Sequence, residues 1–317
     1  MGIKQAAKDL LSTEHLLRLT RGNRFIFNYH DIGSPGVGHH SVRNATPLAL
    51  FQEHLDLIGR LFHVVPLDEL SSGKKLGRGN FASITFDAGF RSVYTDARPL
   101  LRAAGMPYAV FINGAAVTNG DNWISNMEIH SGDRAYLMEV LRSLRISDIG
   151  QANVIDHVIA KGMFTSAFTA AYHRSPPEPP LYMARTELSE LHHEGVMLGD
   201  HTWDHVVLSR CDDRTLMEQL RQGVDLLRSI RGTHSVHHAI PFGKKENYDA
   251  RSLRRLRSAG FTRIYTTNPD RFRRSDAADH RFLIPRIDVV RQTVQELLFT
   301  INRTFFWRYN SGSQRLK

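Results

Sequence analysis

Short runs of β-forming residues alternate with helical patterns along most of this chain, and this alternation constrains the fold more than any other feature. The alternation is typical of parallel strands joined by crossover helices. Seven or eight such units predict an α/β fold, an irregular (β/α)7–8 TIM-like barrel rather than an open sheet. The β-rich runs cover residues 24–30, 62–67, 81–87, 107–112, 196–201, 236–242, 261–267 and 282–289. The helical patterns cover 47–61, 96–105, 185–195, 215–230 and 250–260, and three of them end at glycine, a usual helix stop.

One span interrupts the alternation. Residues 116–185 carry little strand pattern, two predicted helices (133–146 and 151–172) and a proline-rich connector at 173–180. We expect a helical insertion that forms a lid or substrate collar over one mouth of the barrel. The amphipathic segment 291–308 predicts a C-terminal helix that packs on the barrel, with membrane or partner docking as the alternative. The whole chain, 1–317, is therefore predicted to be a single barrel domain.

Composition excludes several classes of protein. No stretch approaches 18 consecutive apolar residues, so no membrane-spanning helix is predicted. The first 25 residues lack the apolar core of a secretory signal, and the single cysteine, Cys211, excludes an internal disulfide framework. These features favour a cytoplasmic protein, with contact at the inner membrane face as an alternative. The net charge of +9 is scattered without an aromatic-interleaved basic motif, so no nucleic acid is expected as partner.

The stretch SITFDAGF, residues 83–90, presents a carboxylate where chemistry is usually found. Asp87 follows a strand-like run and is held by a tight turn at Ala88 and Gly89. Functional residues gather at the carboxyl ends of barrel strands. Asp87 is therefore a candidate catalytic group.

The stretch GDHTWDH, residues 199–205, places His201 and His205 four residues apart after another predicted strand. Two imidazoles so placed can hold a divalent metal such as zinc. With 17 histidines in the chain, a chance pair is the alternative.

Three further candidates follow predicted strands. Phe242, in the turn IPFG, offers a backbone N–H that can stabilise an oxyanion, unless the turn is a plain connection. Arg286, in LIPRIDVV, can hold a carboxylate such as Asp87 by a bidentate pair, unless it lies on the surface. His30, in NYHDI, lies at the same predicted rim, unless it only forms a hydrogen bond in the core.

Taken in order, these motifs resemble the polysaccharide deacetylases of carbohydrate esterase family four, over residues 24–290. YHDI opens the resemblance, SITFDAGF stands where the family has a T-F-D-D-G motif, HTWDH matches H-[ST]-x-x-H, and IPFG matches the Y-P-Y-G form of the third motif. IPRIDV is similar to the closing element of the exopolysaccharide-deacetylase branch. The resemblance implies a deformed (β/α) barrel that hydrolyses N-acyl amides with a divalent metal.

The resemblance also implies roles for particular residues. Asp87 corresponds to the general base, and His201 and His205 to two metal ligands. The third ligand, an aspartate in the family, falls on Ala88. Zinc is the first expectation for the metal, with cobalt, nickel, manganese and iron as alternatives, and Ala88 should weaken its binding. The implied substrate contacts are Tyr29, Trp203 and Pro241.

Two departures from the family pattern concern the proton donor and the third motif. The usual late leucine-x-histidine acid is not visible, since only His280 lies beyond residue 238, and His30 is the candidate acid by elimination. The third motif lacks the arginine of other branches, whose role Arg286 is expected to take.

Ala88 has three competing explanations. It is a substitution introduced to disable the site, a natural change compensated by Asp200 or Asp204 as ligand, or the mark of an inactive homologue that only binds carbohydrate. The expected function is metal-dependent removal of an acetyl or formyl group from an amino sugar, impaired in this chain. The expected substrate is an intracellular nucleotide-linked, lipid-linked or other glycosylated precursor, and the positive charge suits one that bears phosphate.

Overall fold

The computed structural model describes residues 13–35, 40–41, 43–120, 122–130, 133–145, 154–161, 168, 171–172, 180–279, 281 and 283–306. Within these residues one sheet follows the strand order β10-β9-β8-β7-β6-β5-β1-β11, with β4 pairing beside β5, and every pairing in it is parallel. A separate short pair joins β2 (Asp31–Ile32) to β3 (Ala45–Thr46). The strands of the main sheet are β1 (Arg24–Tyr29), β4 (His63–Val64), β5 (Phe81–Phe86), β6 (Tyr108–Ile112), β7 (Met197–Asp200), β8 (His237–Ala239), β9 (Arg263–Thr266), β10 (Leu283–Pro285) and β11 (Ile287–Asp288).

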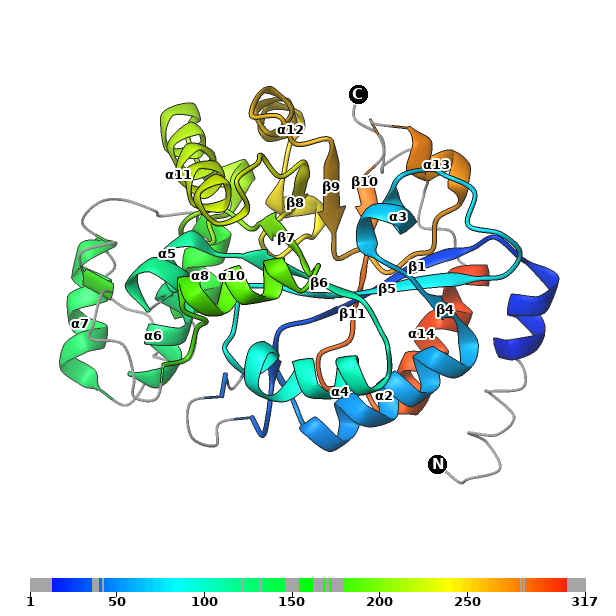
Figure 1. Ribbon diagram of the computed structural model, residues 1–317. Coiled ribbons are helices and arrows are strands. Elements are labelled where there is room, and N and C mark those ends of the chain that lie inside the picture. Colours follow the sequence, from blue (N-terminus) through cyan, green and yellow to red (C-terminus); the bar gives the residue numbers. More distant parts are fainter. Residues whose placement is uncertain are drawn as a thin grey trace.

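The sheet curls until its two edges almost meet, and one residue joins them. Arg286 stands between the edge strands β10 and β11. Its backbone N–H donates to the carbonyl of Thr266 in β9 (3.0 Å), while Ile287 already lies in register with Phe27 of β1. The result is the predicted α/β barrel, nearly closed (Figure 1). The run 282–289, expected as one strand, is thus two strands on opposite edges.

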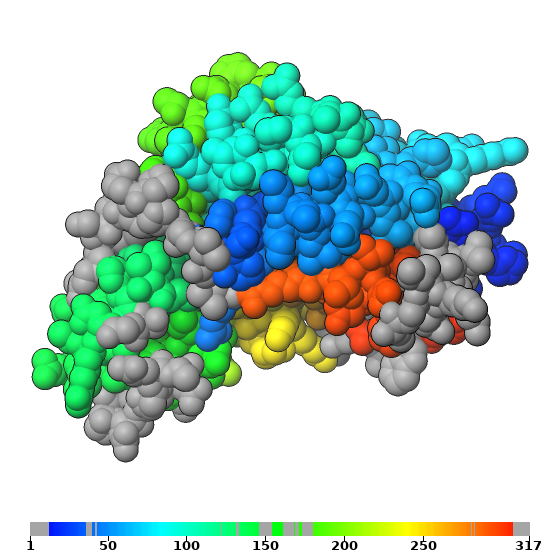
Figure 2. Space-filling model, turned by 90° about the horizontal axis from the view of Figure 1, so that it is seen from below, coloured from blue at the N-terminus to red at the C-terminus, as the bar shows by residue number. Residues whose placement is uncertain are grey.

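Helices cover the outside of the barrel, and the five predicted helical patterns are confirmed. Figure 1 shows α11 and α12 on one side and α2, α4 and α14 on the other, and Figure 2 shows α2 in blue beside α14 in orange. The helices that cover the barrel include α2 (Leu48–Leu61), α3 (Leu67–Ser71), α4 (Arg98–Ala103), α10 (Arg185–His193), α11 (Asp213–Arg231), α12 (Ala250–Ser258), α13 (Arg274–Ala278) and α14 (Val294–Phe306). Shorter helical turns are η1 (Val93–Ala97), η3 (Leu208–Arg210) and η4 (Lys245–Asn247).

Strand periodicity decides which side chains face the inside of the barrel. In β1, Phe25, Phe27 and Tyr29 pack in the core shared with the covering helices, whereas Ile26 packs with side chains of the opposite strands such as Phe111 and Tyr265. Because successive strand side chains point to opposite faces, Asn28 and His30 continue the inner set. The alternation therefore directs polar residues near the end of β1 toward the mouth of the barrel.

Between β6 and β7 the chain forms α5 (Gly114–Asn119), α6 (Trp123–Ile129), α7 (Arg134–Ser143) and α8 (Val154–Lys161). Helices α6, α7 and α8 surround an apolar core of their own, which is distinct from the cores of the barrel. We call α6, α7, α8 and the described residues Phe168, Ala171 and Tyr172 the insertion. The expected helix 133–146 is observed as α7. The expected helix 151–172 begins as α8, and most of its remainder lies outside the described residues, as does the connector 173–179.

The C-terminal helix α14 packs on the barrel as expected. It buries Leu297, Leu298 and Ile301, and the residues after Phe306 lie outside the described part of the chain. Phe299 and Phe306 remain exposed, at 66% and 72%. Among the described residues, no helix combines the length and the apolar character needed to cross a lipid bilayer.

Candidate functional site

The carboxyl ends of the barrel strands surround a cavity of about 500 Å³. Its lining includes His30 after β1, Asp87 and Ala88 after β5, His205 after β7 and Phe242 after β8. His201 and Arg286 are buried directly beside them. Sequence motifs that lie far apart in the chain, such as Asp87 and Arg286 at a separation of 199 positions, therefore meet at one mouth of the barrel.

Asp87 is held by a bidentate ion pair inside the barrel. Arg286 Nη1 lies 2.7 Å from Asp87 Oδ1 and Nη2 lies 2.7 Å from Oδ2, and Asn28 Nδ2 donates to Oδ2 at 3.1 Å. Burial is the largest single influence and by itself would raise the pKa of Asp87, but the Arg286 guanidinium, together with His201 and His30, holds the pKa of that carboxyl well below its usual range. Asp87 is thus ionised at neutral pH, as expected for a group that accepts a proton.

His201 and His205 stand next to this carboxylate as neutral imidazoles. His201 Nδ1 donates to the carbonyl of Ala239 at 2.8 Å, which leaves Nε2 as a free lone pair 3.9 Å from Asp87 Oδ2. The two rings lie 4.7 Å apart, and neither His201 Nε2 nor His205 Nδ1 finds a partner among the described residues. Burial lowers the pKa of His201 to about 4 and holds the pKa of His205 well below its ordinary value. Neutral imidazole is the form that binds a metal ion.

The loops that carry the motifs have strained backbones. Four of the six described residues other than glycine with positive φ lie in them: Ala88 (72°), Thr202 (63°), His205 (54°) and Phe242 (61°). Such conformations cluster at functional sites. At Ala88 the conformation disfavours alanine, whereas aspartate and asparagine visit it more readily. The backbone at position 88 therefore matches the aspartate that the family motif has there.

The residues present do not fit a catalytic divalent metal, which normally has three protein ligands. Among the described residues no group of three His, Cys, Asp or Glu side chains is arranged to hold a metal ion. Asp200 Oδ2 instead accepts from His238 Nδ1 at 2.6 Å, and the side chain lies directly against Gly223 of α11. Asp204 is bonded twice to Gln219, through its backbone N–H and its Oδ2, at 2.7 Å each. Neither carboxylate takes the place of the ligand missing at Ala88.

Phe242 presents its backbone in a fixed turn at the cavity wall. Thr267 Oγ1 donates to the Phe242 carbonyl at 2.7 Å, and the Thr267 N–H donates to the Gly243 carbonyl at 3.0 Å. The Phe242 N–H itself donates to no group within the described part of the chain. This arrangement leaves it available to an oxyanion.

His30, the candidate acid, lies between two carboxylates at the cavity. Its Nε2 is 4.0 Å from Asp87 Oδ2 and its Nδ1 is 3.9 Å from Asp288 Oδ1. Both distances exceed a hydrogen bond, so neither carboxylate holds the ring, and His30 lines the cavity where a ligand can reach it. His280 lies outside the described residues.

None of the three expected substrate contacts is among the described residues that line the cavity. Tyr29 is fully buried on the outer face of β1, where its hydroxyl lies 3.2 Å from His54 Nδ1. Trp203 packs against Gly114 of α5. Pro241 is buried in the turn before Phe242. Strand alternation already implied that His30 and its neighbour Tyr29 face opposite sides.

Sequence reasoning missed several residues that the structure brings to the cavity. Asn28 and Thr85 bond each other at 2.9 Å and support the Asp87–Arg286 pair, and their inward register was the available signal. Asp288, two residues after Arg286, faces His30. Insertion side chains also line the cavity, and no motif in the sequence marks them. They are Ile124, Ser125, Ile155, Asp156, Ile159 and Ala160, and Asn122, directly before α6, joins them.

Comparison with known proteins agrees with this geometry. A family model described as polysaccharide deacetylase matches residues 74–264. No curated protein matches the chain.

Three solved structures illustrate the similarity. The deacetylase PplD of Streptococcus pyogenes, in complex with acetate, is 14% identical, with 89% of this chain and 99% of that chain covered and a TM-score of 0.58. IcaB from Ammonifex degensii is 18% identical, with coverages of 88% and 97% and a TM-score of 0.60. A de-N-acetylase from Aggregatibacter actinomycetemcomitans is 11% identical, with coverages of 89% and 100% and a TM-score of 0.56. At such identities the likeness shows a shared fold.

Proposed function

Since this chain belongs to the polysaccharide deacetylase family, whose members hydrolyse N-acetyl amides of carbohydrates, we propose that it takes an N-acyl amino sugar into the cavity above Asp87. The acyl group is acetyl or formyl, and the sugar belongs to a nucleotide-linked, lipid-linked or other glycosylated precursor. A cytoplasmic location and contact with the inner membrane surface are part of the same proposal. The observation that carries it is the meeting of Asp87, His201, His205 and Phe242 at one mouth of the barrel.

The residues of this chain supply three of the groups that amide hydrolysis needs: a base, an oxyanion donor and an acid. Asp87 is ionised and oriented by Arg286, so it can accept the proton of an attacking water. The free Phe242 N–H stabilises the negative charge that develops on the amide oxygen. His30, within reach of Asp87 and Asp288, protonates the departing amine.

Ala88 limits this machinery. The low pKa of Asp87 makes its carboxylate a weak base, so water needs further activation. In family members a divalent metal supplies that activation. With two imidazoles and no third ligand, we infer that this chain binds zinc or a similar divalent metal weakly and hydrolyses its substrate slowly, if at all.

A second candidate function is carbohydrate binding without turnover. The absence of a three-ligand metal group among the described residues favours it. Such a protein would need neither metal nor Asp87 for its activity.

Zinc calorimetry on this chain and on Ala88→Asp, side by side, tests the proposal. We expect the variant to bind zinc at least about 100-fold more tightly, more than the loss of an outer-shell partner usually costs. In the same background, hydrolysis of N-acetyl and N-formyl amino sugars should appear with Ala88→Asp and vanish when Asp87→Asn is added.

Each alternative has its own signature in these measurements. Equal, tight zinc binding by both proteins would mean that another group already completes the site. Tight zinc binding by Ala88→Asp without turnover of any N-acyl amino sugar would contradict the hydrolase proposal and leave the binding protein.

A further inference from the structure

The wall that the insertion gives to the cavity is apolar. Ile155 and Ile159 lie one turn apart on α8, Ile124 comes from α6, and Phe242 comes from the barrel. All four line the cavity. We call them the isoleucine wall.

The isoleucine wall is continuous with the core of the insertion. Ile124 and Ile155 belong to that core and are each 9% exposed, while Ile159 and Phe242 are half-buried and pack against it. The wall is therefore backed by buried, packed side chains. It also begins at Phe242, whose N–H is the candidate oxyanion donor, so it lies next to the reacting amide.

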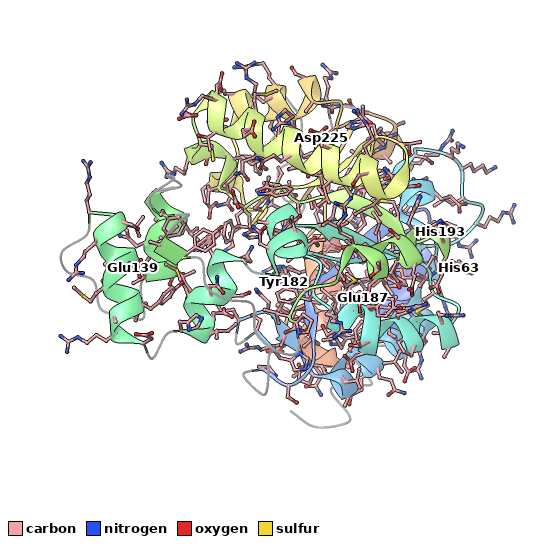
Figure 3. All side chains as sticks on the ribbon, turned by 60° about the vertical axis from the view of Figure 1, so that its left-hand side comes forward. His63, Glu139, Tyr182, Glu187, His193 and Asp225 are labelled. Atoms are coloured by element: carbon pink, nitrogen blue, oxygen red, sulfur yellow. The ribbon has the colours of Figure 1, made fainter. Side chains whose placement is uncertain are left out.

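Polar groups on this side of the cavity are already engaged. Ser125 Oγ and the Tyr182 hydroxyl bond each other at 2.6 Å, and Tyr182 lies between the insertion and the barrel in Figure 3. Arg43 is paired with Asp156 at 3.0 Å. A sugar hydroxyl packed directly against Ile124, Ile155 or Ile159 would lose its water without gaining a partner from those side chains, which is unfavourable.

The charged side chains around the cavity do not form a binding site for an anion. The charged side chains that line it are of both signs: the cations Arg43, Arg210 and Lys244, and the acids Asp87, Asp156, Glu246 and Asp288. The lining thus has no excess of positive charge that would select a phosphate. Apolar contact is the feature that distinguishes the insertion side from the barrel side.

We propose that the substrate is an N-acyl amino sugar that carries an apolar chain, and that this chain lies on the isoleucine wall. This inference rests on the proposed function and names its substrate class. The chain belongs either to the aglycone, as in a lipid-linked sugar, or to the N-acyl group itself. Both sources share the chemistry of an alkyl chain close to the amide.

Binding to the full chain tests the inference, because Ala88 keeps turnover low. Four ligands are compared by ligand-observed NMR titration below their micelle concentrations: methyl N-acetylglucosaminide, hexyl N-acetylglucosaminide, methyl N-hexanoylglucosaminide and hexyl glucoside. We expect one of the two N-acyl sugars with a six-carbon chain to bind at least tenfold more tightly than methyl N-acetylglucosaminide. Which of them gains identifies the source of the chain.

Variants locate the effect. Ile159→Asn should remove the tenfold gain, and Ile159→Ala, a milder change, should reduce it. Ile129→Asn is the matched control, because Ile129 is 44% exposed on α6 and does not line the cavity. It should keep the gain in full.

The possible results distinguish failure of this inference from failure of the proposed function. If methyl, hexyl and hexanoyl ligands bind within twofold of one another, or if Ile159→Asn changes nothing, the inference is overturned and the proposed function stands. If hexyl glucoside binds as tightly as hexyl N-acetylglucosaminide, or if none of the ligands binds, recognition of the N-acyl group is absent and the proposed function itself fails.

Discussion

At the scale of single residues, the Asp87–Arg286 pair sets the electrostatics of the site. Both side chains are buried, and the guanidinium also donates to Asn28 Oδ1 at 2.7 Å. A buried pair of this kind contributes little net stability, but breaking it leaves one charge without a partner. Asp87 therefore affects folding as well as chemistry.

Asp87→Asn should lower the free energy of unfolding by about 3–5 kcal/mol at pH 7. Because the folded pKa of Asp87 lies below the ordinary value of about 3.9, its contribution is present above that value and is lost as pH falls toward the folded pKa. The difference between parent and variant should thus shrink by roughly 1 kcal/mol at pH 3. Urea unfolding with EDTA at both pH values measures it.

The control is Asp225→Asn, an exposed aspartate on α11 that is labelled in Figure 3 and pairs with Arg221 at the surface. It should change stability by less than about 1 kcal/mol. A difference between parent and Asp87→Asn that stays constant from pH 7 to pH 3 would contradict the depressed pKa.

Ala88 is strained, and relief of the strain should be measurable. Ala88→Gly should raise the free energy of unfolding by about 1 kcal/mol, because glycine adopts a φ of 72° without the steric cost that alanine has. Ala103→Gly, at an exposed helical position in α4, should instead lower it by about 1 kcal/mol. If thermal unfolding shows that both variants lose stability equally, position 88 is not strained.

At the scale of elements, the turn after β8 depends on a close approach that only glycine permits. Gly243 has φ 65°, and a Cβ there would meet the Thr267 nitrogen at 2.5 Å. Gly243→Ala should therefore cost more than the roughly 1–2 kcal/mol of the left-handed conformation alone. Gly232→Ala isolates that smaller cost, since φ is 72° and nothing lies within 4 Å of the added Cβ. Equal losses in denaturant unfolding would rule out the close approach.

The elements were predictable from the sequence where a periodic pattern determines them. The strand ending at Asp87 and the helix 215–230 have such patterns, and both were predicted close to their observed bounds. The run 282–289 was not resolved into two strands, because a single residue at the barrel seam changes no local pattern. For the same reason, the sequence indicated that Arg286 can form a bidentate pair with Asp87 but did not decide between that pair and a position on the surface.

The site was less predictable where it depends on tertiary packing. His30, Asp87, His205 and Phe242 follow strands, so their place at the cavity follows from parallel topology. The position of the isoleucine wall does not follow from the topology, because an isoleucine on a short helix has the same local sequence whether it faces a core or a cavity. The assignment of Tyr29 ignored the alternation of β1, which directs it outward.

At the scale of the whole molecule, two separately packed regions meet at the cavity. The insertion has its own core, and Figure 3 shows α7, with Glu139 labelled, projecting away from the barrel. Regions with separate cores open with different free energies. The wall that contacts substrate is thus able to loosen while the barrel stays folded.

Leu137→Ala should test this separation. Leu137 is 3% exposed in the core of the insertion, so its truncation should cost about 2–5 kcal/mol. Hydrogen exchange should accelerate in α6, α7 and α8 but not in β1 and β5. Met138→Ala, on the same helix and 39% exposed, should leave both regions unchanged. Equal acceleration in the insertion and the strands would show that the two cores unfold as one.

The position of Arg286 at the seam of the barrel has a consequence for biosynthesis. A ribosome releases Asp87 about two hundred residues before it releases the arginine that neutralises it. Until then, burial of the Asp87 carboxylate is unfavourable, because its charge has no partner. The two edges of the sheet also lack the residue that connects them. The nascent chain therefore cannot assemble its reactive centre before Arg286 has emerged, and the same peptide unit completes both the architecture and the chemistry.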